Sequence, residues 1–378
     1  MDYIRLGDVA TYINGYAFKP EDRGKSGLPI IRIQDLTGNA YDLGYYDGEY
    51  PDRIEINNGD VLISWSASLG VYIWNKGKAL LNQHIFKVIF DKKPIDKQFF
   101  IYAVENILHL MESKTHGATM KHIIKKDFDN TFISYPSPER QREIADNLTK
   151  VKAIINARKT ELKRLDDLIK ARFVEMFGRG NHKMVKAFEV CDFITKGTTP
   201  PTCEIVEEYG EGKIPFLKVY NLSFTGEMLF DDNPQFVLEE THNGKLSRSK
   251  VYPNDVLMNI VGPPLGKFTL VTDEFEEWNI NQAIAIFRAK ERILPKFLLH
   301  ALMQPTVLEP FIGQAVGIRQ QNLSLEQCRN LQFPLPSLEE QKIFVEFSEK
   351  LDKSKFVVQK ALDEDQLLFD SLMQKYFG

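Results

Sequence analysis

Three short stretches of the chain contain residue types that could support catalysis, and each lacks an essential member. Residues 262–265 are Gly-Pro-Pro-Leu, close to a motif of amino-methyltransferases, but that motif needs Asn or Asp for the target amine and an aromatic residue to stack on a flipped base. Residues 262–268 fall one residue short of a phosphate-binding loop and lack its Ser or Thr. Residues 51–57 lack the Lys that a metal-dependent nuclease needs. No arrangement of nucleophile, base and acid is visible in the sequence either.

Composition narrows the class of protein further. The chain has 378 residues, of which 43% are hydrophobic and 11% aromatic, which is enough for two cores of ordinary size. Its three cysteines, Cys191, Cys203 and Cys328, are odd in number and its seven histidines show no ligand spacing, so we expect neither a disulfide framework nor a metal site. No apolar run approaches membrane-spanning length and residues 1–5 do not resemble a signal peptide, which predicts a cytoplasmic protein without membrane contact.

The sequence elements that would position functional residues are repeated along the chain. Gln141 and Phe177 are 36 residues apart, as are Gln341 and Phe377, and each pair brackets a helical stretch that follows prolines. Framework positions in the globular parts correspond as well: residues 59–62 with 254–257, 82–83 with 281–282, Gly117 with Gly317, and 29–32 with 215–218. The offset changes along the chain, so the loops between matched positions differ in length. The repeat predicts approximate twofold symmetry with two similar working ends; the alternative is a duplicated structural domain whose loops have drifted.

The two helical stretches carry matching apolar stripes at alternating spacings of four and three. We expect the pair to meet along a seam formed by Ile144, Leu148, Val151, Ile155, Leu162, Leu165, Ile169, Phe344, Leu351, Val358, Leu362, Phe369 and Leu372. Residues 139–177 have a net charge of +3 and residues 339–377 a net charge of −3, which favours their pairing with each other. Because a globular part separates them, an antiparallel coiled coil within the chain is expected. The alternative is two separately packed core helices.

The globular parts have the sequence pattern of a mixed α/β (α+β) fold. Short β-branched and aromatic runs predict strands, and each part then has a predicted helix, at 96–113 and 295–309. We therefore expect a first globular domain at 1–138, a first long helix at 139–178, a second globular domain at 179–336 and a second long helix at 337–378.

The doubled order of motifs resembles one known family. Each half has an Asp-Val-Leu strand with a following Ser/Gly loop, Asn-Gln, a Gly turn, a Pro-containing start and a long helix. Residues 117–121 (Gly-Ala-Thr-Met-Lys) and 334–341 match best, whereas the first helix start at 136–141 is two residues shorter and the turn at 317–321 matches loosely. Over essentially the whole chain this order resembles specificity (S) subunits of type I restriction-modification systems.

The resemblance implies a DNA-recognition subunit without catalytic activity. Each globular domain would be a target recognition domain for one half of a bipartite, asymmetric site in double-stranded DNA, and the helix pair would set the unspecified spacer. Two methyltransferase (M) subunits would dock on the assembly, and restriction (R) subunits would join through them. S-adenosylmethionine, ATP and magnesium would then belong to these partners, and the chain itself would hold no cofactor.

The same resemblance implies that loops supply the DNA contacts, since base edges and phosphates are contacted by Arg, Lys, Asn, Gln, Ser and Thr side chains. In the first domain the candidates are Lys19, Arg23, Lys25, Ser64, Trp65, Ser66, Ser68, Lys114, His116, Thr119, Lys121, His122, Lys125 and Lys126. In the second domain they are Lys196, Thr198, Thr199, Asn259, Lys267, Gln314, Arg319, Gln320 and Gln321. For Trp65 we favour a contact with a base step over a hydrophobic plug.

Two other classes of protein remain open on the sequence alone. The chain could be a scaffold of two α/β modules on a coiled coil that binds proteins and has no role on DNA. It could also be an enzyme whose site the sequence does not reveal.

Overall fold

The computed structural model describes residues 2–38, 42–114, 124–178, 180–262, 264–312 and 322–378. The chain divides into two compact units, and the two long helices contribute to both. Unit 1 comprises Met1–Ala157 and Ala361–Gly378, and unit 2 comprises Arg158–Lys360. Each unit is described by itself below.

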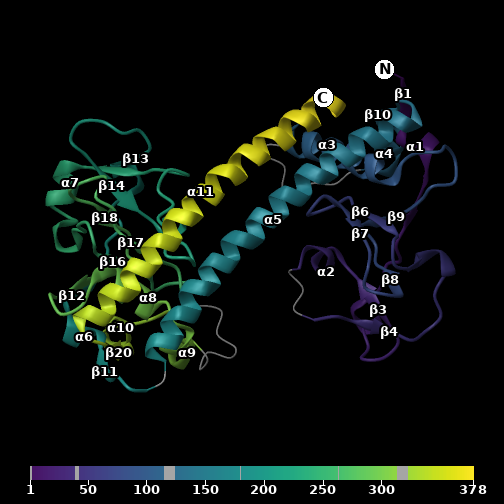
Figure 1. The fold of residues 1–378 in the computed structure, drawn as a ribbon. Coiled ribbons are helices and arrows are strands. Elements are labelled where there is room, and N and C mark those ends of the chain that lie inside the picture. The colour runs from purple at the N-terminus through teal and green to yellow at the C-terminus, as the bar shows by residue number, and fades with distance from the viewer. Residues whose placement is uncertain (1, 39–41, 115–123, 179, 263, 313–321) are drawn as a thin grey trace. The chain divides into compact units, whose positions relative to one another are not determined.

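Unit 1 is built on two small four-stranded sheets (Figure 1). The first has the order β2-β9-β6-β7 and is antiparallel, and the second has the order β4-β3-β8-β5 with β3 and β8 parallel. The strands are β1 (Tyr3–Arg5), β2 (Thr11–Asn14), β3 (Leu28–Ile31), β4 (Tyr45–Tyr46), β5 (Glu55–Ile56), β6 (Val61–Ser64), β7 (Gly70–Ile73), β8 (Ala79–Leu81), β9 (Ile85–Ile89) and β10 (Phe132–Ser134). The helices are α1 (Leu6–Val9), α2 (Ile33–Thr37), α3 (Lys97–Lys114) and α4 (Lys125–Asn130).

Unit 2 has the same plan. One sheet has the antiparallel order β12-β19-β16-β17, and the other has the order β13-β15-β14-β18 with β14 and β18 parallel. The strands are β11 (Lys183–Lys186), β12 (Cys191–Lys196), β13 (Ile205–Val206), β14 (Lys213–Leu217), β15 (Phe236–Leu238), β16 (Val256–Asn259), β17 (Phe268–Leu270), β18 (Asn279–Ile280), β19 (Ile284–Ala289) and β20 (Gln332–Leu335). The helices are α6 (Ala187–Val190), α7 (Glu239–Asn243), α8 (Pro295–Leu302), α9 (Pro305–Ile312) and α10 (Leu325–Arg329).

The predicted repeat and the mixed α/β fold class are confirmed by this topology. The sheet β2-β9-β6-β7 corresponds strand by strand to β12-β19-β16-β17, and the parallel pair β3 and β8 corresponds to β14 and β18. In both units the first strand pairs with the strand that precedes the long helix, β1 with β10 and β11 with β20. The strand that leads into the helix is therefore tied to the start of its own domain.

The central strands are apolar on both faces because they lie between two cores. In β6, Val61 and Ile63 pack in the cluster that includes α3, whereas Leu62 packs in the cluster of the second sheet. In β16, Met258 faces the cluster of α8 and Leu257 faces the other way. Successive strand residues point to opposite faces, so the first sheet contacts a helix on one face and the second sheet on the other. Each half therefore has three layers: helix, first sheet and second sheet.

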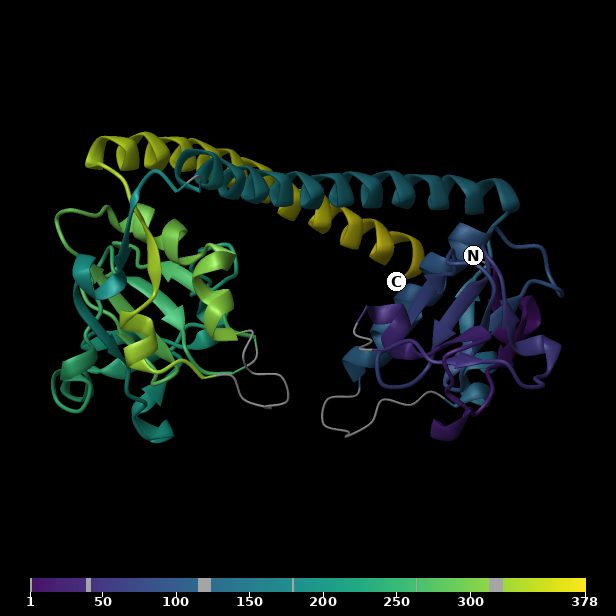
Figure 2. The ribbon, with the colours of Figure 1, turned by 90° about the horizontal axis from the view of Figure 1, so that it is seen from below.

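The two long helices, α5 (Pro138–Phe177) and α11 (Leu338–Phe377), have 40 residues each. At ~1.5 Å per residue, each is about 60 Å long. Within unit 2 they lie along one side of the globular part (Figure 2).

The contacts within each unit run in the antiparallel sense. In unit 1 the guanidinium of Arg140, near the start of α5, lies 5.5 Å from the ring centroid of Tyr376, near the end of α11. In unit 2 Phe173, near the end of α5, meets Phe344, near the start of α11, with ring centroids 5.3 Å apart. The start of one helix therefore meets the end of the other in both units.

The residues that we expected in the helix seam are all withdrawn from solvent to some degree. Buried are Ile144, Leu148, Val151, Ile155, Ile169, Phe344, Val358 and Leu362. Half-buried are Leu162, Leu165, Leu351, Phe369 and Leu372. Two polar residues, Ser348 and Lys355, are also buried on α11 at positions that correspond to Leu148 and Ile155 of α5.

One glutamine at the start of each long helix anchors that helix to its domain. Gln341 is fully buried; its side-chain oxygen accepts from the backbone N–H of Leu294 at 2.8 Å, and its amide donates to the carbonyls of Pro336 at 3.0 Å and Arg292 at 3.2 Å. Gln141 repeats this pattern with the N–H of Asp96 and the carbonyl of Pro136. The side chain joins the turn before α3 or α8 to the turn before the long helix, so the helix leaves its domain in a fixed direction.

Replacement of Gln341 with Ala should therefore destabilise the protein. An unpaired buried polar group costs about 1–3 kcal/mol, so with the N–H of Leu294 left without its partner we expect the free energy of unfolding to fall by about 3 kcal/mol. Denaturant unfolding of the purified variant measures this loss. Gln374→Ala, at an exposed position on the same helix, is the matched control and should change stability by less than about 0.5 kcal/mol. Equal unfolding midpoints for the two variants would contradict the anchor.

Candidate nucleic-acid interface

The sheet topology brings the predicted contact loops to one edge of each unit. In an antiparallel sheet β12 and β16 end at the edge where β17 and β19 begin. The loops after β12, between β16 and β17, and before β19 therefore meet there, and the N–H of Gly197 donates to the carbonyl of Ile284 at 3.1 Å. Unit 1 repeats the arrangement, with Gly15 donating to Ile85 at 3.1 Å. We call these the loop edges of units 1 and 2.

A further segment reaches the loop edge of unit 2. Asn322 forms a β-bridge with Val261, and the N–H of Leu323 donates to the carbonyl of Ile260 at 2.9 Å. The predicted contacts Gln314, Arg319, Gln320 and Gln321 precede Asn322 in the sequence and lie outside the described residues, as do His116, Thr119, Lys121 and His122 in the first half. Lys114 is the last residue of α3.

Two predicted DNA contacts are wrong, because Ser64 and Asn259 are buried. Ser64 is fully buried at the end of β6 and its hydroxyl donates to the carbonyl of Ser68 at 2.5 Å. Asn259, at the matching end of β16, is 1% exposed; its amide donates to the carbonyl of Pro264 at 3.0 Å and its side-chain oxygen accepts from the N–H of Lys267 at 2.8 Å. Both residues hold the shape of the loop that follows them, and neither side chain is accessible to a base.

Trp65 has a packed environment, which favours a hydrophobic plug over a contact with a base step. Its ring is half-buried and stacks on Phe86 with centroids 5.5 Å apart, and it meets His84 edge to face at 4.9 Å. The indole N–H donates to the side-chain oxygen of Asn14 at 3.3 Å. Trp65 thus joins the ends of β2, β6 and β9 at the loop edge of unit 1.

Other predicted contacts of unit 1 lie in exposed positions. Lys19, Arg23, Lys25 and Ser68 are exposed, and Ser66 is half-buried. Lys125 is exposed too but belongs to α4, which packs on α1 at the other end of β2. Its ammonium lies 2.7 Å from Asp129 and 5.9 Å from the ring centroid of Tyr12. The structure therefore separates Lys125, and with it the exposed Lys126 on the same helix, from the loop edge.

At the loop edge of unit 2 the predicted contacts hold partners of their own. The ammonium of the half-buried Lys267 lies 5.7 Å from the ring centroid of Phe224, and the hydroxyl of Thr199 accepts from the N–H of Gln282 at 3.4 Å. Lys196 is exposed at the end of β12. The half-buried Thr198 accepts from Nε and Nη2 of Arg248 at 3.2 and 3.1 Å.

Sequence reasoning missed Arg248, which is exposed on the 3-10 turn Ser247–Ser249. Both hydrogen bonds to Thr198 use the same lateral edge of the guanidinium, and no other partner of Arg248 lies among the described residues. The terminal pair of nitrogens matches the O6 and N7 acceptors of guanine. Only the fold brings the turn to Thr198, fifty residues away in sequence, so no local signal could have identified it.

A buried network fixes the turn that carries Arg248. The hydroxyl of Ser249 donates to Asn279 at 3.1 Å, the amide of Asn279 lies 3.0 Å from Nδ1 of His242, and Nε2 of His242 lies 2.9 Å from Glu277. Burial lowers the pKa of His242, although the bond to Glu277 opposes this shift. The imidazole is therefore neutral near pH 7, with its proton on Nε2 toward Glu277. Such a network holds Arg248 in place before any ligand binds.

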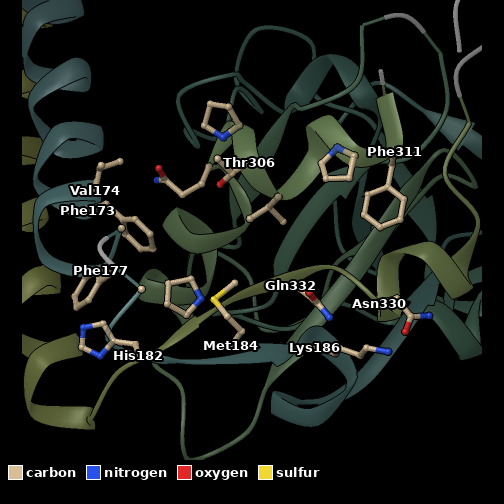
Figure 3. A pocket seen from close by; sticks show the side chains of 17 residues that line it. Phe173, Val174, Phe177, His182, Met184, Lys186, Thr306, Phe311, Asn330 and Gln332 are labelled. Atoms are coloured by element: carbon tan, nitrogen blue, oxygen red, sulfur yellow. The ribbon is translucent and has the colours of Figure 1, made fainter. Parts of the chain in front are cut away.

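Unit 2 also contains a cavity and two buried thiols. A cavity of about 850 Å³ in unit 2 is walled largely by apolar side chains such as Phe173, Phe177, Met184 and Phe311, and no carboxylate is among the residues that line it (Figure 3). Burial raises the pKa of the Cys191 and Cys328 thiols to about 12, so neither is a thiolate at neutral pH. In the described ranges no group of three or more His, Cys, Asp or Glu could hold a metal ion. Likewise, no described helix combines the length and apolarity that crossing a membrane requires.

Comparison with known proteins agrees with this geometry. The chain is 26% identical, over an alignment 407 positions long, to the specificity subunit of the type I restriction enzyme EcoBI from Escherichia coli; the alignment covers 99% of this chain and 85% of that protein. It is 25% identical to the MjaVIII specificity subunit from Methanocaldococcus jannaschii, with 93% and 86% covered.

Solved structures share the fold. A chain from a structure described as the structural basis of complex assembly and conformational transition of the type I R-M system matches with a TM-score of 0.54 at 18% identity, covering 99% of this chain and 97% of that chain. The S subunit of a type I restriction-modification system from M. genitalium matches with a TM-score of 0.53 at 16% identity, covering 100% and 96%.

The family model described as "Type I restriction modification DNA specificity domain" matches residues 1–164 and 180–364, one match for each half of the repeat. These two matches together take in most of the chain, and they fall on the two halves whose antiparallel sheets, β2-β9-β6-β7 and β12-β19-β16-β17, share one topology. The chain therefore belongs to the family of type I restriction-modification DNA specificity proteins.

Proposed function

We propose that the chain is the specificity subunit of a type I restriction-modification complex in which each unit recognises one half of a bipartite, asymmetric DNA site. The observation that carries this proposal is that both units have a loop edge at the same place on matching antiparallel sheets, whereas the loops themselves differ. Two frameworks of the same topology would present their loops to DNA in equivalent ways, and different loop residues would select different bases.

Partners supply the chemistry in this proposal. Methyltransferase subunits bind S-adenosylmethionine and methylate adenine, and restriction subunits that use ATP and magnesium join through them; the complex works in the cytoplasm. The family to which the chain belongs is that of the specificity subunit, which is not itself catalytic.

The long helices offer surface for the methyltransferase subunits to dock. On α11, Phe356 and Val357 of unit 2 are 72% and 66% exposed, and Leu367 of unit 1 is 68% exposed. Large apolar side chains this exposed on a soluble helix are typical of a protein interface. We propose that they pack against the two methyltransferase subunits, one for each unit.

The helix pair would also set the spacer between the half-sites. The predicted domains at 1–138 and 179–336 are each followed by one long helix, at 139–178 and 337–378. A continuous antiparallel coiled coil of these helices, with its pseudo-twofold symmetry, would hold two recognition domains a constant distance apart. A scaffold that binds only proteins would need no such constant distance, and this difference separates the two functions by experiment.

The direct test of this function is genome-wide mapping of methylated adenines in a host that lacks adenine methyltransferases of its own. Co-expression of the chain with its methyltransferase subunit should yield one asymmetric motif with two specified parts and an unspecified spacer, because each unit selects one part. Expression of the methyltransferase subunit alone is the control. Absence of any bipartite motif would favour the protein-interaction scaffold.

Arg248 provides a test at the level of one base pair. Arg248→Ala should relax the motif at a single position of the half-site read by unit 2, with a loss of about 1–3 kcal/mol of discrimination, because a bidentate contact to guanine is lost. The matched control is Lys245→Ala, which removes a positive charge from the same stretch where the ammonium is held by Glu204. Methylation mapping measures both; an unchanged motif in Arg248→Ala would show that Arg248 does not contact a base.

Lengthening both helices tests whether they set the spacer. Insertion of one heptad after Leu162 and one after Leu362 preserves the apolar seam and adds about 10 Å to each helix. At about 3.4 Å per base pair, the motif should keep both half-sites and gain up to about three base pairs of spacer. Mapping of methylated adenines measures the spacer. Methylation with an unchanged spacer would contradict the role of the helices, and altered half-sites would show that recognition extends beyond the globular domains.

A further inference from the structure

A buried lysine interrupts the apolar seam of α11 in unit 2. Lys355 is 6% exposed and occupies the position that corresponds to Ile155 of α5. Its ammonium lies 2.7 Å from the carboxylate of Asp166 on α5 and 2.6 Å from that of Glu227, in the loop between the 3-10 turn Val219–Asn221 and β15. One positive charge therefore joins both long helices and the globular part of unit 2.

The ammonium of Lys355 lies at the centre of a cluster of charged side chains. A cavity of about 410 Å³ beside it is lined by the apolar side chains of Leu162, Leu299 and Phe356. The neighbouring Lys296 on α8 is paired with Asp352 of α11 at 2.6 Å. His300 is buried, and burial lowers its pKa to about 4, so it adds no charge at neutral pH. Burial alone would lower the pKa of Lys355, but the bonds to Asp166 and Glu227 outweigh it and raise the pKa.

The loop that carries Glu227 is held tightly against the same surface. Gly226 has φ +87°, and a Cβ added there would lie 3.1 Å from side-chain atoms of both Leu299 and Met303. The N–H of Glu227 donates to the hydroxyl of Ser223 at 2.7 Å. These contacts fix the backbone of the loop, and the ion pair with Lys355 holds the Glu227 carboxylate, whose side chain is 53% exposed.

Stability does not explain a lysine at this position. Buried ion pairs can often be replaced by apolar residues of similar volume with no loss of stability, and sometimes with a gain, because removing the charges from water costs about as much as their attraction returns. A buried polar group in a helix seam has a different effect: it disfavours registers in which it lacks its partner. An apolar residue can pack in more than one register, whereas the pair of Lys355 with Asp166 forms in one.

We propose that Lys355 is a positioning residue that locks α11 to α5 in one register and both helices to the Glu227 loop, so that the complex accepts a single spacer length. The proposal rests on the proposed function, in which the helices set the distance between half-sites. It differs from a purely structural role because it concerns selectivity among spacers rather than the stability of the fold.

Steady-state methylation by the purified complex with methyltransferase subunits tests the proposal. Duplexes that carry both half-sites with the native spacer, or with one base pair more or fewer, serve as substrates. For Lys355→Met we expect the rate on the altered spacers, relative to the native one, to rise by at least about fivefold, the lower end of typical coupling between distant sites. Thermal unfolding of this variant should occur no lower than in the wild type.

Matched variants separate positioning from folding. Lys353→Met removes a charge from an exposed position of the same helix and should behave as wild type. Lys355→Arg retains the charge and should retain the selectivity. Glu227→Gln leaves the pair of Lys355 with Asp166 intact and should loosen spacer selectivity to a smaller degree; it decides the outcome if Lys355→Met fails to fold.

Two results would overturn the proposal. The first is equal spacer selectivity in Lys355→Met and Lys353→Met. If Lys355→Met fails to fold, the second is wild-type selectivity in Glu227→Gln. A wild-type complex without any bipartite motif would instead refute the proposed function, and the inference with it, so the two failures are distinguishable.

Discussion

One buried glutamine at the start of each long helix ties that helix to its own domain through hydrogen bonds. The direction in which the helix leaves the domain depends on these bonds. Gln141 and Gln341 each bind the backbone of two turns, one before the domain's own helix and one before the long helix. The adjacent strand, β10 or β20, is paired with the first strand of the same domain. A long helix transmits direction only if its first turn cannot pivot. Polar bonds in a buried site supply this constraint better than apolar packing does, because they require a particular direction as well as a distance.

Buried side chains hold the loops of the loop edges in shape. They do so through hydrogen bonds within the protein. Ser64 and Asn259 close the loops that follow β6 and β16, and the chain from Ser249 to Glu277 holds the turn beneath Arg248. Side chains that are held before binding lose less conformational entropy when they bind, so more of the contact energy remains to discriminate between bases. The two units thus use the same device with different residues.

The sequence alone predicted the framework well and the interface poorly, for physical reasons that particular residues show. The repeat, the strands and the apolar stripes follow from local spacing. The strand orders of the two halves confirmed the repeat, and the stripe residues are buried or half-buried. Ser64 and Asn259 were mistaken for DNA contacts because residue type indicates polarity but not burial, and burial is decided by tertiary packing. Arg248 was missed because its partner Thr198 is fifty residues distant. The anchoring role of Gln141 and Gln341 has no local signal, because their partners Asp96 and Leu294 are 45 and 47 residues distant in the sequence.

The distribution of charge suggests how affinity and specificity are divided in the assembled complex. The chain has a net charge of −4, and residues 179–378 hold 22 basic against 28 acidic residues. Nonspecific affinity for DNA comes chiefly from neutralised phosphates and released counterions, which an acidic chain supplies poorly. The described loop edges instead offer a few oriented groups, such as Arg248 and Lys267, that suit base edges better than a phosphate track. We therefore expect a recognition subunit of this charge to depend on its partners for retention on DNA.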